Sequence, residues 1–401
     1  MKKLIFILSI SILGAVSCTK KEEGLRQLDE YQTFYKGDVY ITGNTDMSVF
    51  KNITTIDGSL TLSDGNTYGH PPVGSITPVK DISALKNLKT ITGNFTLSSV
   101  NQLKSLEALS NLETINGDVA IASSSLTSFS GLQKLTKLKS IVISSTGPEL
   151  SLKGFGKNIA ITQLTINNNH SLKKLTDLES LGLVTFFSLQ GNVNLTSVGD
   201  MVNTTIGNQF IISGSPLLTS LGKINVSSNA AIHILDTDLD NLSCLSNLTK
   251  IQQLFIGNNK NLRTLNLEKL TTVPHFALYG SDFIKSLSGL ENCKINSVNI
   301  SNNFALENVD ALKNMNGGNS VNISNNPNLK SIDGLSNLGE NNSGFSTVNI
   351  TGNINLSNLC PIAKVVRQIM KARETNAHIQ VPNITNNAVR MTVDEMMKNC
   401  L

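Results

Sequence analysis

The stretch that decides the fold runs from residue 239 to residue 259 and reads LDNLSCLSNLTKIQQLFIGNN. Apolar residues recur in it at every third position, from Leu239 through Leu242, Leu245 and Leu248 to Ile251. A period of three matches neither the α-helix, with about 3.6 residues per turn, nor the strand, with a period of about two. It predicts a coil that turns around a core and points every third side chain inward.

The end of this stretch alternates instead, and the alternation repeats along the chain. Leu254 and Ile256 flank Phe255, and the same apolar-x-apolar-x-x-Asn unit returns at 298–303, 321–326 and 348–353. The first apolar residue of the unit recurs at positions 39, 60, 95, 119, 141, 164, 187, 210, 232, 254, 276, 298, 321 and 348. Most steps are 22 or 23 residues, with an insertion between 62 and 82 and a smaller one near 340. We therefore expect about 14 stacked coils whose single strands form one long parallel sheet.

An asparagine stands at a fixed offset after many of these strands. Backbone N–H and C=O groups at a tight corner need partners when they are buried, and an inward asparagine side chain can supply them. The sequence therefore predicts an asparagine ladder, although asparagines without such a role are also common in loops. The asparagines that share this offset are Asn44, Asn169, Asn192, Asn259, Asn303, Asn326 and Asn353.

These repeats resemble two known families. The unit Ile251-x-x-Leu254-x-Ile256-x-x-Asn259 is similar to the leucine-rich repeat, while 88–97 (LKTITGNFTL) and 112–121 (LETINGDVAI) resemble the receptor L domain. The resemblance covers roughly residues 36 to 360, and several coils fit both families. It implies a β-rich solenoid, a right-handed coil with one parallel strand per 22–23-residue repeat. A small helical cap is expected at the C-terminal end.

The N-terminus has the order of a secretory signal peptide. Lys2 and Lys3 precede an apolar run over 4–16, which is too short to cross a hydrocarbon core of about 30 Å as a helix. The sequence Ala15-Val16-Ser17-Cys18 follows and resembles the bacterial lipobox, with Ala15 where leucine is usual. We expect a signal peptide over 1–17 and a lipid on Cys18, which begins a tether over 18–35. A plain signal peptide cut near residue 17 is the alternative.

The residues after the cysteine suggest where the protein is located in the cell. Thr19-Lys20-Lys21-Glu22-Glu23 resembles the surface-export signal of Bacteroidetes lipoproteins, which implies anchoring in the outer membrane with exposure at the cell surface. The inner leaflet remains the other possibility. The chain has 33 basic and 29 acidic residues in mixed order, so no basic stripe for nucleic acid is expected.

The C-terminal 361–401 segment is expected to cap the solenoid that spans 36–360. Apolar residues at helical spacing predict one helix over 361–373, and Thr392 with Glu395 has capping-box spacing before a second helix over 393–399. Cys360 and Cys400 flank the segment and are candidates for a disulfide; two free buried thiols are the alternative. Cys244 and Cys293 lie inside repeats and are expected to be small buried residues.

Catalytic and metal-binding patterns are missing from the sequence. It contains no HExxH, GxSxG or Walker motif, and no two cysteines have CxxC spacing, so we expect no enzyme, no cofactor and no zinc site. Asp236, Asp238 and Asp240 resemble the start of a calcium loop, but the twelfth position is Asn247 where an EF-hand has glutamate. A solvated acidic corner is the better interpretation.

The outward side of the strands offers the most informative surface. Polar residues are expected at both ends of the sheet and bulkier ones in the middle, which predicts an apolar patch on the central coils. Either a ligand binds there, or a cap, an insertion or self-association covers it. We expect a non-catalytic binding or adhesion scaffold for a protein or glycan; a passive structural lipoprotein is the alternative. The residues of this candidate patch are Phe186, Ile211, His233, Leu235, Phe255, His275 and Tyr279.

Overall fold

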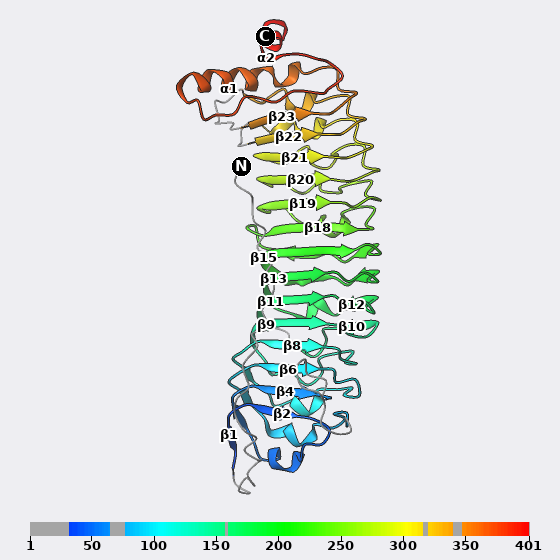
Figure 1. Cartoon of the computed structure of the whole chain (residues 1–401), viewed down its shortest axis with the longest axis vertical. Helices are drawn as coiled ribbons and strands as arrows, with labels where there is room; N and C mark the ends of the chain where they lie inside the picture. The colour runs from blue at the N-terminus through cyan, green and yellow to red at the C-terminus, as the bar shows by residue number, and fades with distance from the viewer. Residues whose placement is uncertain (1–31, 65–76, 157–158, 316–319, 340–346, 401) are drawn as a thin grey trace.

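The molecule is an elongated solenoid in which parallel strands stack along the long axis (Figure 1). It is a computed structural model that describes residues 32–64, 77–156, 159–315, 320–339 and 347–400. The predicted signal peptide, Cys18 and most of the tether lie outside the described residues. Within the described part, no helix is both long and apolar enough to cross a membrane.

One long sheet runs through the molecule, and each of its strands contains the position that the repeat predicts. Each first apolar position pairs with the next, from Val39 opposite Leu60 to Val321 opposite Val348. The predicted solenoid with one parallel strand per repeat is therefore confirmed. In spatial order the strands are β2 (Val39–Ile41), β4 (Leu60–Ser63), β6 (Phe95–Ser98), β8 (Val119–Ala122), β9 (Lys137–Ser144), β11 (Ala160–Asn167), β13 (Leu183–Gln190), β15 (Met201–Ser215), β18 (Ala231–Thr237), β19 (Gln253–Gly257), β20 (His275–Tyr279), β21 (Ser297–Ser301), β22 (Ser320–Ser324) and β23 (Thr347–Thr351).

Short strands and turns complete each coil. One side sheet pairs β1 (Phe34–Lys36), β3 (Thr55–Asp57), β5 (Thr90–Ile91) and β7 (Thr114–Ile115); another pairs β10 (Glu149–Ser151), β12 (Lys174–Thr176), β14 (Ser197–Val198) and β16 (Ser220–Leu221), while β17 (Ile224–Val226) pairs with β15. Single 3₁₀ turns are η1 (Met47–Phe50), η2 (Ser83–Asn87), η3 (Glu107–Leu109), η4 (Leu178–Ser180), η5 (Ser243–Leu245), η6 (Asp310–Asn314), η7 (Asp333–Leu335) and η8 (Cys360–Ile362). The side sheets were not predicted, because two- or three-residue strands show no periodicity of their own.

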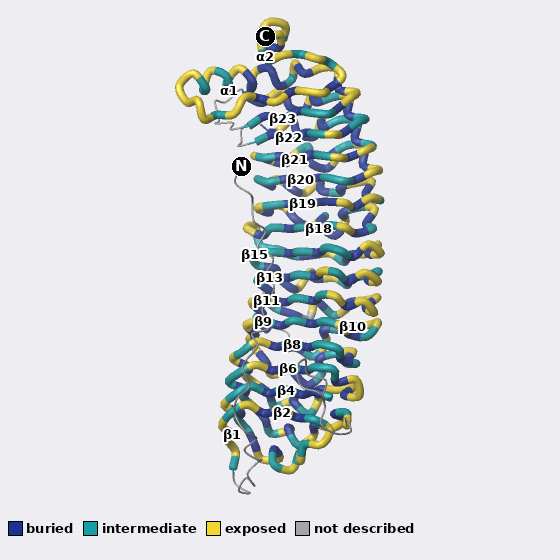
Figure 2. Tube along the Cα trace, in the orientation of Figure 1, coloured by how far each residue is buried: buried dark blue, intermediate teal, exposed yellow. Residues whose placement is uncertain are grey.

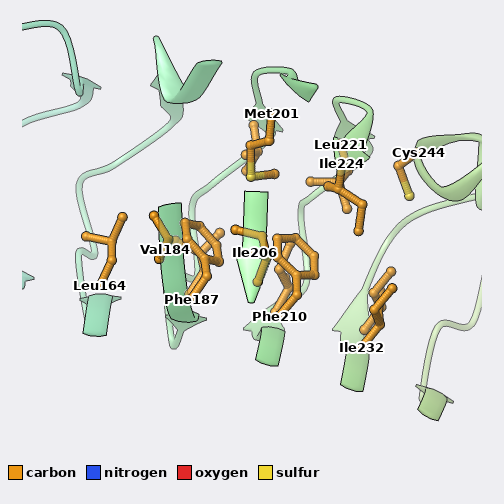
Figure 3. Close-up of a cluster of buried hydrophobic side chains, with 14 of the residues drawn as sticks. Leu164, Val184, Phe187, Met201, Ile206, Phe210, Leu221, Ile224, Ile232 and Cys244 are labelled. Atoms are coloured by element: carbon orange, nitrogen blue, oxygen red, sulfur yellow. The ribbon is translucent and has the colours of Figure 1, made fainter. Parts of the chain in front are cut away.

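The core is a continuous column of apolar side chains inside the coils. Buried residues recur in every coil along the length of the trace (Figure 2). The period-three residues Leu242, Leu245 and Ile251 are at most 1% exposed. Aromatic rings stack from coil to coil: Phe187 and Phe210 have ring centroids 5.2 Å apart (Figure 3). Cys244 and Cys293 are buried free thiols, as predicted, and burial raises the pKa of each to about 12.

The asparagine ladder is present at the corners that follow the strands, with one exception: Asn44 is exposed and does not belong to it. The buried members are Asn169, Asn192, Asn259, Asn303, Asn326 and Asn353. Asn326 is fully buried, and its Nδ2 donates to the Ile300 carbonyl, 3.0 Å away, while its Oδ1 accepts from the Asn303 backbone N–H, also 3.0 Å away. Asn353 repeats this arrangement for the preceding corner. Each such asparagine thus satisfies the backbone of the coil before it. Other coils place serine or threonine at the same position: Thr146, Ser215, Thr237 and Ser281.

The residue before each ladder position takes left-handed backbone. Asn258, Asn302 and Asn325 have φ between 54° and 57°, and Gly280 and Gly352 occupy the same place with φ of 65° and 70°. Glycine and asparagine tolerate this region best, which explains their recurrence at the corner.

Two helices cover the C-terminal end, α1 (Ala363–Thr375) and α2 (Val393–Asn399). The apolar side of α1 is buried, and Thr392 and Glu395 form the predicted capping box at the start of α2. In the structure Cys360 and Cys400 are joined by a disulfide, with their Cα atoms 5.1 Å apart.

A further strand-like segment lies between the two helices and was missed by the sequence analysis. The segment 382–387 reads PNITNN, close to VNISNN at 321–326. Asn383 pairs with Asn349 of β23, and the Asn387 side chain accepts from the Asn353 backbone N–H at 3.1 Å, so the ladder continues into the cap. Pro382 stands where the other coils have an apolar residue, and a proline has no N–H to offer to a further strand.

Candidate functional site

The outward side of the long sheet, called the sheet face below, is organised in three columns. They are the residues before, between and after the two inward apolar residues of each strand. In β19 these are Gln253, Phe255 and Gly257, and the strand register places the equivalent residues of each neighbouring coil directly beside them. From β9 to β23 the three columns contain no Asp, Glu, Lys or Arg.

The middle column brings the centre of the predicted patch together. Ile211 pairs with His233, and His233 pairs with Phe255. The rings of His233 and Phe255 stack, with centroids 5.0 Å apart and planes 10° from parallel. Ala277 follows in the column and is buried.

The third column adds a second apolar contact around a glycine. Leu235 and Tyr279 are the neighbours of Gly257 on its two sides. A Cβ atom at Gly257 would lie 2.1 Å from the Tyr279 Cζ, so the tyrosine ring lies directly over the glycine backbone. Only a residue without a side chain leaves room for the ring in this position.

Phe186 and His275 share the first column, at opposite ends of the predicted patch. Phe186 is on β13 and His275 on β20, with β15, β18 and β19 between them. Phe186 is 36% exposed, whereas Ile211, His233, Leu235, Phe255, His275 and Tyr279 are partly buried against their neighbours. The expected patch is therefore smaller and more self-covered than the sequence suggested, because adjacent outward side chains pack on one another.

The electrostatics of the patch follow from this packing. Burial lowers the pKa of His233, which favours the neutral imidazole, and its buried Nε2 has no hydrogen-bond partner within the described residues. Burial, and secondarily the nearby Asp236 carboxylate, raise the pKa of Tyr279, so its hydroxyl stays protonated. The patch thus presents uncharged groups at neutral pH.

The carboxylates of the acidic corner beside the patch accept hydrogen bonds from asparagine side chains of the same protein. Asp236 accepts from the Asn258 side chain at 2.9 Å, Asp238 accepts from Asn261, and Asp240 accepts from Asn241 at 2.6 Å. Asp236 and Asp240 are exposed. The three carboxylates are therefore engaged with amides, and no group of three or more potential metal ligands occurs in the part of the chain that the structure describes.

Comparison with known families supports this architecture. Residues 52–182 match the receptor L domain family model. The receptor L domain match covers the N-terminal coils, and the strand register extends the same repeat to β23. The fold is therefore a leucine-rich-repeat or receptor-L-domain-like solenoid, a class that usually serves as a non-catalytic scaffold.

Two solved structures have a distant likeness to the chain. One is an internalin from Listeria monocytogenes, with 15% identity over 86% of this chain and 76% of that chain, and a TM-score of 0.35. The other is the mouse RP105/MD-1 complex, with 16% identity over 88% of this chain and 63% of that chain, and a TM-score of 0.36. The fold assignment depends on the strand register and the family match.

Proposed function

We propose that this protein is a non-catalytic binding scaffold that uses the sheet face, centred on Ile211, His233 and Phe255, to hold a protein or glycan ligand. The observation that carries the proposal is the unpartnered Nε2 of His233 inside a stacked aromatic pair. A buried polar atom without a partner costs about 1–3 kcal/mol, and an apolar side chain would avoid that cost. Groups that lower stability without a structural benefit are typical of functional sites.

We further propose that a lipid on Cys18 anchors the scaffold at the surface of a bacterial outer membrane. The support is the sequence order of basic residues, apolar run and cysteine, followed by the export-like Lys20-Lys21-Glu22-Glu23. Cys18→Ser should abolish incorporation of a labelled fatty acid. Protease added to intact cells should then degrade the wild-type protein if it faces outward, and a protected protein would contradict surface exposure.

The binding role is tested on the purified protein with a glycan array and with pull-downs from envelope and medium extracts. Phe255→Ala and His233→Ala should weaken retention of the ligand about tenfold or more if the patch is central to binding. Asn328→Ala is the matched control, because Asn328 is a partly exposed corner residue outside the three columns, and its side chain donates to the Phe304 carbonyl. Retention unchanged by both patch variants would remove the patch from the site, and absence of any ligand would favour a passive structural role.

A further inference from the structure

The absence of charge on the sheet face is unusual for a surface of this protein. Charged residues make up 15% of the whole chain, yet ten successive strands from β9 to β23 carry none in their three outward columns. Typical soluble domains have about 25% charged residues. A flat polar sheet without charge also lacks the repulsion that keeps such surfaces from associating.

This face constrains the chemistry of a ligand. An acidic sugar or a protein surface rich in lysine would lose water on docking and find no opposite charge, which costs several kcal/mol per buried ion. An uncharged ligand has no such cost. Charge complementarity therefore favours a neutral partner over the acidic polysaccharides and most protein surfaces.

The C-terminal part of the face is rich in hydrogen-bonding groups. The Asn322 side chain donates to Asn299 Oδ1 at 2.8 Å, and the Asn349 side chain donates to Asn322 in the same direction. This outward amide ladder uses one of the two N–H groups on each amide nitrogen. Rows of hydroxyls border it on both sides, formed by Ser297, Ser320 and Thr347 in the first column and Ser301, Ser324 and Thr351 in the third.

The amide ladder and the central patch follow one another along the same columns. The stacked His233 and Phe255 rings precede Ala277, and Asn299 comes next in the middle column. A sugar ring has apolar C–H faces and a rim of hydroxyls that both donate and accept, so it matches the Tyr279 ring, which lies over Gly257, together with amides and serine hydroxyls. The His233 and Phe255 rings each cover one face of the other and add apolar surface beside it. Strands repeat about every 4.8 Å along the axis, an interval close to the length of one hexose in an extended chain.

We propose that the sheet face binds an uncharged, extended polysaccharide along the solenoid axis, with sugar rings over His233, Phe255 and Tyr279 and hydroxyls on the Asn299–Asn322–Asn349 ladder. This proposal rests on the binding role given above and specifies its ligand. It requires no bond-making step, only desolvation and hydrogen bonding. Association through many equivalent coils means that longer chains should bind more tightly than short oligosaccharides.

The test is native affinity electrophoresis of the full chain in gels that contain one polysaccharide each. Neutral probes are laminarin, xyloglucan, galactomannan and starch; acidic probes are polygalacturonate and alginate. We expect at least one neutral polymer to retard the protein and neither acidic polymer to do so. Stronger retardation by an acidic polymer, or none by any neutral one, would overturn the proposal.

Variants locate the site on the face. Asn322→Lys places a charge in the ladder and should weaken retardation about tenfold or more, as should Phe255→Ala. Asn328→Lys adds the same charge at a partly exposed corner outside the three columns and should leave retardation unchanged. Circular dichroism and thermal melting confirm that each variant is folded, so a loss of binding is not a loss of fold. Equal retardation of Asn322→Lys and Asn328→Lys would also overturn the proposal.

The two levels of the hypothesis fail differently. If no polysaccharide binds but a purified protein partner is retained in a Phe255-dependent way, the binding role stands and the glycan assignment is wrong. If neither a polysaccharide nor a protein is retained through the face, the binding role itself is wrong.

Discussion

The buried asparagine ladder gives the sharpest stability prediction, and substitution of Asn326 tests it. Its side chain donates to the Ile300 carbonyl and accepts from the Asn303 backbone N–H, both in the preceding coil. Asn326→Ala removes both partners inside a fully buried corner. At about 1–3 kcal/mol for each of the two orphaned groups, the expected loss is about 2–6 kcal/mol.

The matched control is Asn328→Ala, two residues away. Asn328 is only partly buried and donates to the Phe304 carbonyl at 2.9 Å, so water can reach that carbonyl when the side chain is removed. The expected loss is within about 0.5 kcal/mol. Guanidinium unfolding compares the two variants, and hydrogen exchange of peptides covering 297–330 shows whether the loss is local, since solenoids need not unfold in one step.

An isosteric variant separates hydrogen bonding from packing. Asn326→Asp keeps the volume and one acceptor for Asn303, but it replaces the donor that meets the Ile300 carbonyl with a second acceptor. It should be at least as destabilising as Asn326→Ala. If Asn326→Asp were nearly neutral, or if Asn326→Ala cost no more than Asn328→Ala, the ladder would not satisfy the corner as described.

Four further predictions concern the patch and the cap. His233→Phe should raise the free energy of unfolding by roughly 1 kcal/mol, because it removes the unpartnered Nε2; a loss of stability would show that this atom has a partner. Burial lowers the pKa of His233 in the folded state, so the unfolded chain binds a proton at a higher pH than the folded chain. Stability should therefore be complete above about pH 6.5 and fall as the pH drops below it. Denaturant midpoints should fall less with acid in His233→Phe than in the wild type. Gly257→Ala should cost roughly 1–3 kcal/mol through its clash with the Tyr279 ring, and the cost should disappear in a Tyr279→Ala background in a double-mutant cycle. Cys360→Ser opens a loop of 40 residues and should lower the free energy of unfolding by about 2–4 kcal/mol; reductant should lower that of the wild type by a similar amount. Equal stability of the variant and the oxidised wild type would mean that the bridge to Cys400 does not hold the cap.

The repeat could be predicted from sequence because its two periods are both set by burial. Every third residue of a coil faces the core, so Leu242 and Leu245 had to be apolar, and the alternation around Phe255 marked the strand. Asn326 was recognisable because a buried corner needs a side chain that both donates and accepts.

Other features had no such signal. The segment 382–387 was missed because Pro382 replaces the expected apolar residue and helix α1 interrupts the repeat before it. The degree of exposure of the patch depends on contacts between outward neighbours, such as Tyr279 over Gly257, and the burial pattern of the core says nothing of those. The charge-free columns became visible only when the strand register fixed which residues lie side by side.

The asparagine ladder also gives the molecule a direction. Each corner that is followed by a ladder asparagine is completed by that asparagine of the next coil, and the last one, at Asn353, is completed by Asn387 from the cap. When a coil detaches, the corner of the neighbouring coil on its N-terminal side therefore loses its hydrogen-bond partners. The corner of the coil on its C-terminal side keeps them. Unfolding should therefore spread from the cap toward the N-terminus. The disulfide-bonded helices of the cap oppose its first step, because they hold the last coil in place.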